Sequence, residues 1–209
     1  MKHLKKLAAA AAAATLLFGL TACGDGGTSD AQAEQTAPNG DVFNEADVEF
    51  ATAMIPHHAQ ALVMVDLTRG RDLSREVQKL SEEILAAQGP EIEQMVDWLT
   101  EWGKPIPETV RDHANAEGHG MSGHDTGDDD STDMPGMMTE EEMSELKAAQ
   151  GPEFETMWLQ MMIEHHKGAI EMAKDEQADG VFQPAKDLAE SIETSQQADI
   201  DHMNELLAS

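Results

Sequence analysis

Apolar residues recur at helical spacing in the first half of the chain, with polar residues between them. The pattern predicts a helix from about 45 to 69, with Asn44 as its N-cap and Asp47 three positions on. A second helix is expected from about 72 to 102, with apolar residues at i, i+4 and i+7. Gly89-Pro90 should kink or interrupt it, since proline lacks a backbone donor.

The second half of the chain shows the same periodicity. It predicts helices at about 152–178 and 181–207, with a turn at Asp179-Gly180 between them. A short helix should precede them, because Thr139 and Glu142 form a capping-box pattern.

The two halves are copies of one unit. A shift of 108 residues aligns 50–99 with 158–207 without a gap and with thirteen identities. Met54-Ile55-x-His57-His58 falls on Met162-Ile163-x-His165-His166. A single helical hairpin cannot bury its apolar face alone. We therefore expect an all-α four-helix bundle over 43–208, made of hairpins 43–102 and 139–208.

The segments outside the hairpins have other compositions. Residues 1–22 combine lysines with an Ala-rich apolar stretch and end in Leu-Thr-Ala before Cys23, which is similar to a lipoprotein signal peptide. Residues 23–42 resemble a flexible tether, and 103–138 a long mobile loop. We therefore expect an extracytoplasmic protein that is anchored to a bacterial membrane by lipid on Cys23.

Charge and cysteine content narrow the possible functions. The chain has 41 acidic and 13 basic residues, a formal charge of −28, and loss of the three signal lysines leaves −31. Nucleic-acid binding is excluded, because it needs a basic surface. The single Cys excludes a disulfide scaffold, and because it stands at the lipidation position it is not expected to serve in an active site.

Two His-His pairs at equivalent positions of a repeat point to a polar or metal site inside the bundle. Adjacent helical residues differ by about 100° around the axis, so one pair cannot aim both rings at one point, and either member could bind. Glu91 and Asp199 interrupt the apolar stripes of the second and fourth helices and should face these imidazoles. Imidazole with thioether suits copper, Cu(I) especially, and imidazole with carboxylate also suits Cu(II), Zn or Fe. Ordinary core packing is the alternative for the methionines.

The loop carries a second group of soft and borderline ligands. Copper capture outside the cell would account for methionines in a Gly- and Asp-rich stretch, and a solvated acidic loop is the alternative. The residues concerned are His119, Met121, His124, Met134, Met137 and Met138.

The paired motifs resemble a bacterial family called domain of unknown function 305. They are Met54-Ile55-Pro56-His57-His58-x-Gln60-Ala61 and Met162-Ile163-x-His165-His166-x-Gly168-Ala169. The resemblance covers about 43–208 and implies a ferritin-like bundle, and some members are linked to extracytoplasmic copper binding. It implies that the metal-binding residues are His57, His58, His165, His166, Met54, Met64, Met162 and Met172.

The function expected from these features is copper binding, sequestration or handover to a copper-handling protein. A protein-interaction module without metal is the alternative. A di-metal oxidase is disfavoured, because di-iron bundles carry Glu three residues before a ligand His, and methionine or isoleucine stands there in this chain. The sequence does not fix the oligomeric state.

Overall fold

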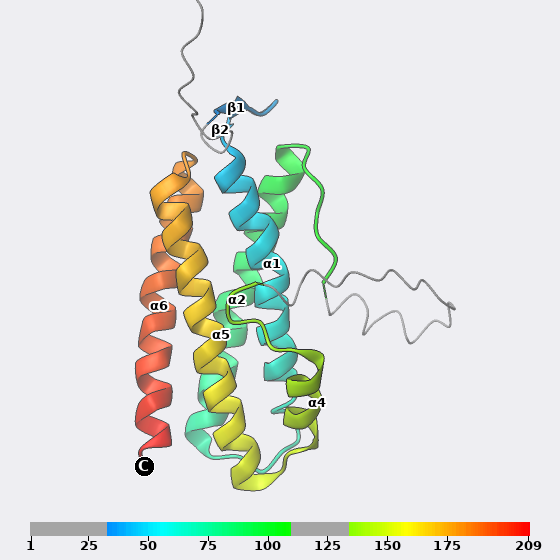
Figure 1. Ribbon diagram of the computed structural model, residues 1–209, viewed down its shortest axis with the longest axis vertical. Coiled ribbons are helices and arrows are strands. Elements are labelled where there is room, and N and C mark those ends of the chain that lie inside the picture. The colour runs from blue at the N-terminus through cyan, green and yellow to red at the C-terminus, as the bar shows by residue number, and fades with distance from the viewer. Residues whose placement is uncertain (1–32, 110–133) are drawn as a thin grey trace, which may run out of the picture.

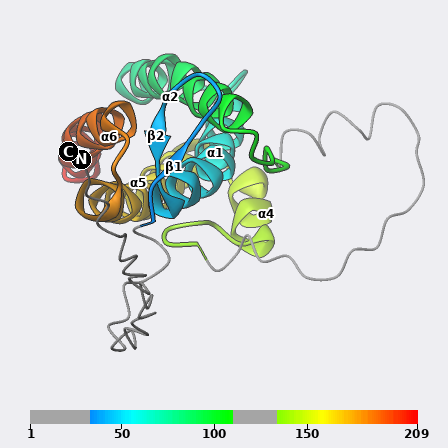
Figure 2. The ribbon, with the colours of Figure 1, turned by 90° about the horizontal axis from the view of Figure 1, so that it is seen from above.

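The computed structural model describes residues 33–109 and 134–209, in which four long helices form an antiparallel bundle (Figures 1 and 2). They are α1 (Glu45–Asp66), α2 (Arg75–Glu101), α5 (Gly151–Asp179) and α6 (Gln183–Leu207). Helix α1 packs against α2 and α5, and α5 packs against α6, so α1 and α5 form the inner pair. The predicted all-α fold of two helical hairpins is confirmed.

The short helix α4 (Glu140–Ala148) lies beside α5, outside the ring of four (Figure 2). Thr139 caps it with the predicted capping box. Of the kink or interruption predicted at Gly89-Pro90, the interruption is wrong, because α2 runs through both residues as one element. Proline removes a single hydrogen bond there, and apolar contacts on both sides of it hold the helix in place.

The start of α1 is fixed to the turn between α5 and α6. Asn44 and Asp47 form a capping box, as the sequence predicts. The Asp47 carboxylate also accepts hydrogen bonds from the backbone N–H groups of Val181 and Phe182. The buried carboxylate of Asp47 thereby joins the two hairpins at one end of the bundle.

The segment before α1 is more ordered than the tether interpretation anticipates. Strands β1 (Gln35–Thr36) and β2 (Val42–Phe43) pair antiparallel and lie across the end of the bundle (Figure 2). Phe43 is buried and stacks on Trp102, with ring centroids 4.6 Å apart. Asn39 and Gln35 in this segment also form hydrogen bonds with Glu101 and Lys104, which its composition does not indicate.

Two hydrophobic clusters fill the bundle, one on each side of a polar layer. The first cluster takes residues up to 55 from α1 and from 169 onward in α5. The second takes residues from 61 onward in α1 and up to 163 in α5, with Ile170 in addition. The four motif histidines lie in the interval between them. None of the helices in 33–109 and 134–209 is both long and apolar enough to cross a membrane.

Glu176 is buried, and neither of its carboxyl oxygens has a hydrogen-bond partner among the described residues. Burial, followed by the neighbouring Asp47 carboxylate, raises the pKa of Glu176 from 4.5 to about 9. Its side chain folds over Gly180, where an added Cβ would lie 2.2 Å from Oε1. The native protein therefore keeps a proton that the unfolded chain loses above pH 4.5, and this lowers stability as the pH rises toward 9.

Glu176→Gln should therefore raise the melting temperature at pH 8 by several degrees, and the gain should shrink toward pH 4.5. Glutamine keeps the shape and can donate to Asp47 without an ionisation penalty. Thermal unfolding followed by circular dichroism tests this, with the exposed Glu171→Gln as control. An equal gain at both pH values would contradict the assigned protonation.

Candidate metal centre

Four histidines from α1 and α5 make up the polar layer. His57, His58, His165 and His166 are all fully buried. The rings of His57 and His165 contact each other across the interface of the two repeats, with centroids 3.7 Å apart and planes 37° apart. Within each helix the neighbouring rings are more than 6 Å apart. One member of each pair is therefore central and the other lies to the outside.

Each outer histidine forms a hydrogen bond with the carboxylate that was predicted to face it. His58 Nε2 donates to Glu91 Oε2 at 2.8 Å, and His166 Nε2 to Asp199 Oδ2 at 3.4 Å. Both pairs have the same separation in sequence, as the repeat requires. The predicted placement of these carboxylates against the imidazoles is confirmed, and the shorter Asp side chain accounts for the longer distance.

The central histidines differ in their partners. His57 Nε2 donates to the backbone carbonyl of Pro135 at 3.1 Å, and neither nitrogen of His165 has a hydrogen-bond partner. The Nδ1 atoms of all four rings are buried and unpaired. A metal-binding histidine typically donates its other N–H to a carboxylate or a backbone carbonyl. His57, His58 and His166 each have such an outer partner and a free Nδ1 lone pair.

Burial keeps His57, His165 and His166 neutral. Burial, followed by the charge of His58, lowers the pKa of His57 from 6.5 to about 3. Burial, followed by the charge of His57, holds the pKa of His165 well below 6.5. Burial also lowers the pKa of His166, although Asp199 opposes the shift. A neutral imidazole is the form that binds a metal ion, so these three rings are in the binding form at pH 7.

Two glutamines extend the polar layer into the outer helices. Gln88 and Gln196 occupy equivalent positions of the repeat, and the Oε1 atom of each is buried without a partner. Each precedes by about one helical turn the carboxylate, Glu91 or Asp199, that holds an outer histidine. Buried polar atoms without partners are rare in native proteins and indicate a missing ligand or water.

The predicted methionines lie in the hydrophobic clusters that border the layer. Met54 is fully buried in the first cluster, and Met172 is half-buried against it. Met64 and Met162 are fully buried in the second. Packing therefore accounts for all four, and their sequence positions keep Met54 and Met162 within one helical turn of the histidines.

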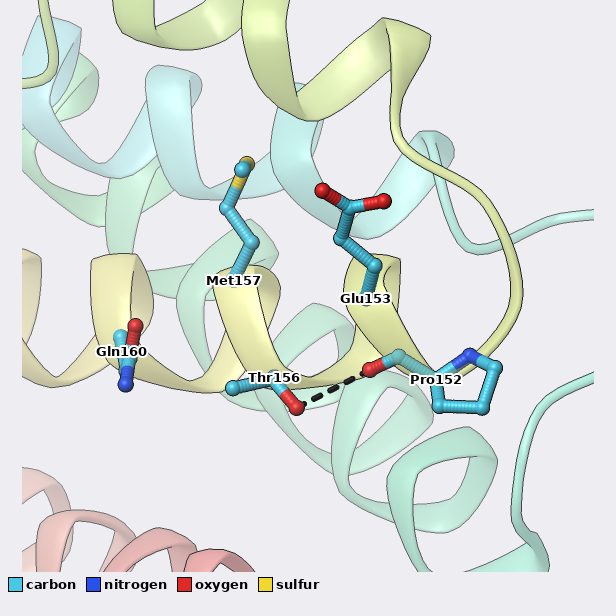
Figure 3. Close-up of a pocket in the computed structure, with 5 residues that line it drawn as sticks. All are labelled: Pro152, Glu153, Thr156, Met157 and Gln160. Atoms are coloured by element: carbon cyan, nitrogen blue, oxygen red, sulfur yellow. Dashed lines mark hydrogen bonds between the residues drawn. The ribbon is translucent and has the colours of Figure 1, made fainter.

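The histidine layer is not a ready-made multidentate site. Within 33–109 and 134–209, no group of three or more His, Cys, Asp or Glu side chains is arranged to hold one metal ion. The open hollow at the first turns of α5 is a separate feature (Figure 3). Its lining includes Met157 and Glu153 but none of the motif residues.

The loop residues fall into two groups. Cys23, His119, Met121 and His124 lie outside the described residues. Met134 and Met137 are half-buried, and Met138 is buried in the second hydrophobic cluster. The hydrophobic core therefore accounts for Met138, which the composition of the loop does not indicate.

The profile of DUF305, a domain of unknown function, matches residues 47–207. The chain belongs to the DUF305 family. No protein of curated function matches this chain.

Solved structures share its fold. A DUF305 protein from Streptomyces coelicolor, which is named as a secreted protein, is 32% identical, with 78% of this chain and 91% of that chain covered and a TM-score of 0.63. A DUF305 fragment from Deinococcus radiodurans is 27% identical, with coverages of 83% and 99% and a TM-score of 0.64. CopM in its Cu(II)-bound form is 24% identical, with coverages of 78% and 95% and a TM-score of 0.59, a likeness that shows the fold alone.

Sequence reasoning missed three residues around the histidines, Gln60, Pro135 and Gly168. Gln60 and Gly168 stand at equivalent positions of the repeat, where the two units differ. That difference was visible as a mismatch between two otherwise similar motifs. The mismatch is explained by the segment that contains Pro135 and Met138, which packs against Gln60 and Gly168. This segment lies outside the repeat.

Proposed function

We propose that this DUF305 protein is an exported, lipid-anchored copper-binding protein that buffers, sequesters or hands on copper. The observation that carries the proposal is the buried layer of four histidines, whose Nδ1 atoms all lack a partner. Burying such lone pairs without a ligand is unfavourable. A metal ion bound in the layer would give a partner to those Nδ1 atoms that coordinate it.

The chemistry of the donors favours copper over the alternatives. Neutral imidazoles bind Cu, Zn and Fe, and thioethers select for Cu(I). Met54 and Met162 are the thioethers nearest in sequence to the imidazoles on both inner helices. Cu(I) accepts low coordination numbers, which agrees with a centre built on the contact between His57 and His165. CopM, which has the same fold, is known in Cu(II)-bound and Cu(I)-bound forms.

The surroundings of the centre have supporting roles in this proposal. Glu91 and Asp199 hold the outer imidazoles in one tautomer. The strongly acidic chain raises the local concentration of cations. The segment containing His119, Met121, His124, Met134 and Met137 collects copper with lower affinity. Lipid on Cys23 keeps the protein at the membrane, where a copper-handling partner could receive the ion.

Metal content of the soluble part of the mature chain, residues 24–209, tests the proposal. The protein is equilibrated with Cu(I), Cu(II), Zn(II) or Fe(II), beside a version that lacks 112–133 and keeps the packed residues 134–138. Copper retained in both proteins places the site in the bundle. Loss of copper from the shortened protein alone would place the site in the loop. Absence of metal from both proteins would support the alternative, a protein-interaction module without metal.

Removal of one outer carboxylate should weaken copper binding without abolishing it. Glu91→Ala leaves His58 Nε2 without its acceptor, and loss of such an outer partner typically reduces affinity by about 10–100-fold. Competition with a copper chelator measures the change. The exposed Glu93→Ala removes an equal charge from the same helix and should have little effect. Equal losses in both variants would show a general charge effect.

A further inference from the structure

Residues 134–138, here called the strap, pack against α1 and α5 and contact the central histidine His57. Gln60 of α1 binds the end of the strap twice: its Nε2 donates to the Met138 carbonyl at 2.8 Å, and the Met138 N–H donates to its Oε1 at 2.7 Å. Both hydrogen bonds are buried. This paired contact fixes the strap to α1 three residues beyond His57.

The strap also touches α5 at the backbone level. A Cβ on Gly168 would lie 1.9 Å from the Pro135 carbonyl oxygen, so only glycine allows this approach. Gly136 has a φ of 75° and faces the Glu164 carbonyl, where an added Cβ would lie at 2.6 Å. Glycine is therefore needed on both sides of the contact. The repeat places Gln60 on one inner helix to bind the strap and Gly168 on the other to admit it.

Between these two anchors, the Pro135 carbonyl accepts the Nε2 proton of His57. A carbonyl can only accept, so this bond fixes the His57 tautomer and leaves the lone pair on Nδ1. His165, at the equivalent position on α5, has no such partner. The strap thus makes the two central rings unequal and covers the one that it orients.

We infer that the strap is part of the metal centre, with the Pro135 carbonyl orienting His57 and the strap controlling how fast a metal ion enters and leaves. The inference rests on the proposed function for its metal, but the placement of the strap does not. Gln60, Pro135 and Gly168 are positioning residues in this arrangement. Metal release should require the strap to separate from α1 and α5.

Gly168→Ala tests the inference, because the added methyl group must displace the Pro135 carbonyl. Gly89→Ala is the matched control, since it makes the same change inside a helix with nothing within 4 Å of the new Cβ. In Gly168→Ala we expect transfer of Cu(I) to a chelator to be at least tenfold faster at unchanged stoichiometry. Gln60→Met, which removes both hydrogen bonds from the other helix, should act in the same direction.

Two readouts need no metal. Hydrogen exchange at the Met138 amide and modification of His57 by diethyl pyrocarbonate should each be at least tenfold faster in Gly168→Ala and Gln60→Met than in Gly89→Ala. Unchanged rates of hydrogen exchange and His57 modification in both variants would overturn the inference. Unchanged copper transfer in a variant whose strap exchanges faster would overturn it too. Failure of the wild-type protein to bind copper would instead overturn the proposed function, while the metal-free readouts would still decide where the strap lies.

Discussion

Replacing His57 and His165 together by alanine should remove copper from the bundle, with affinity lower by at least about a hundredfold, or roughly 2.7 kcal/mol. These two rings contact each other at the interface of the repeats and present three nitrogens without partners. The clusters on either side of the layer are untouched, so the helices should remain. Copper stoichiometry and competition with a chelator measure the loss, and circular dichroism reports the fold.

The control is His202→Ala, which removes an exposed imidazole from α6. A second pair, His57→Leu with His165→Leu, fills the space better and keeps the test valid if the alanine pair unfolds. Copper bound by either double variant with wild-type stoichiometry and affinity would contradict the assignment. The copper site would then lie in the loop or at the outer histidines, His58 with Glu91 and His166 with Asp199.

The repeat allowed much of this architecture to be predicted. An exact register of 108 residues placed Glu91 and Asp199 on the helices opposite the histidine pairs, and the structure brings them together. The sequence could not say which histidine of each pair is central, because the two are separated by only about 100° of helix rotation. That choice depends on how α1 and α5 pack, which is a long-range property.

The two segments whose packing escaped prediction lie outside the repeat. The strap is held by backbone atoms of Pro135 and Met138, and backbone groups are the same in every sequence. The segment before α1 is held by Phe43 on Trp102 and by the hydrogen bonds of Asn39 with Glu101 and of Gln35 with Lys104. Both lie in stretches of loop-like composition. The composition of a segment is an average over its residues. The packing of these two segments depends on a few individual groups, which an average does not identify.

Acid should destabilise the metal-free bundle steeply between pH 6.5 and pH 3. His57, with its pKa near 3, stays neutral in the folded protein over this range, whereas the unfolded chain takes up a proton below 6.5. The unfolded state then binds more protons, so the free energy of unfolding falls as the pH falls. Each pH unit below 6.5 costs about 1.4 kcal/mol for one such histidine. His165 and His166 shift in the same direction and add to the loss.

Glu176 has the opposite dependence, because acid relieves its ionisation penalty. The measurement is therefore made in Glu176→Gln protein, with urea unfolding at pH 7, 6, 5 and 4. A domain of this kind is stable by about 5–15 kcal/mol, so a loss of several kcal/mol should bring unfolding within reach near pH 4. The His57→Ala, His165→Ala pair should flatten the dependence.

Copper should oppose the acid effect, because a metal ion and a proton compete for the same nitrogen. Saturating copper should therefore shift the acid transition to lower pH in the wild-type centre and leave it unchanged in the double histidine variant. A transition of equal midpoint with and without copper would mean that the ion does not bind these rings. A steep acid transition that survives their removal would mean that groups other than His57 and His165 set the acid limit of the fold.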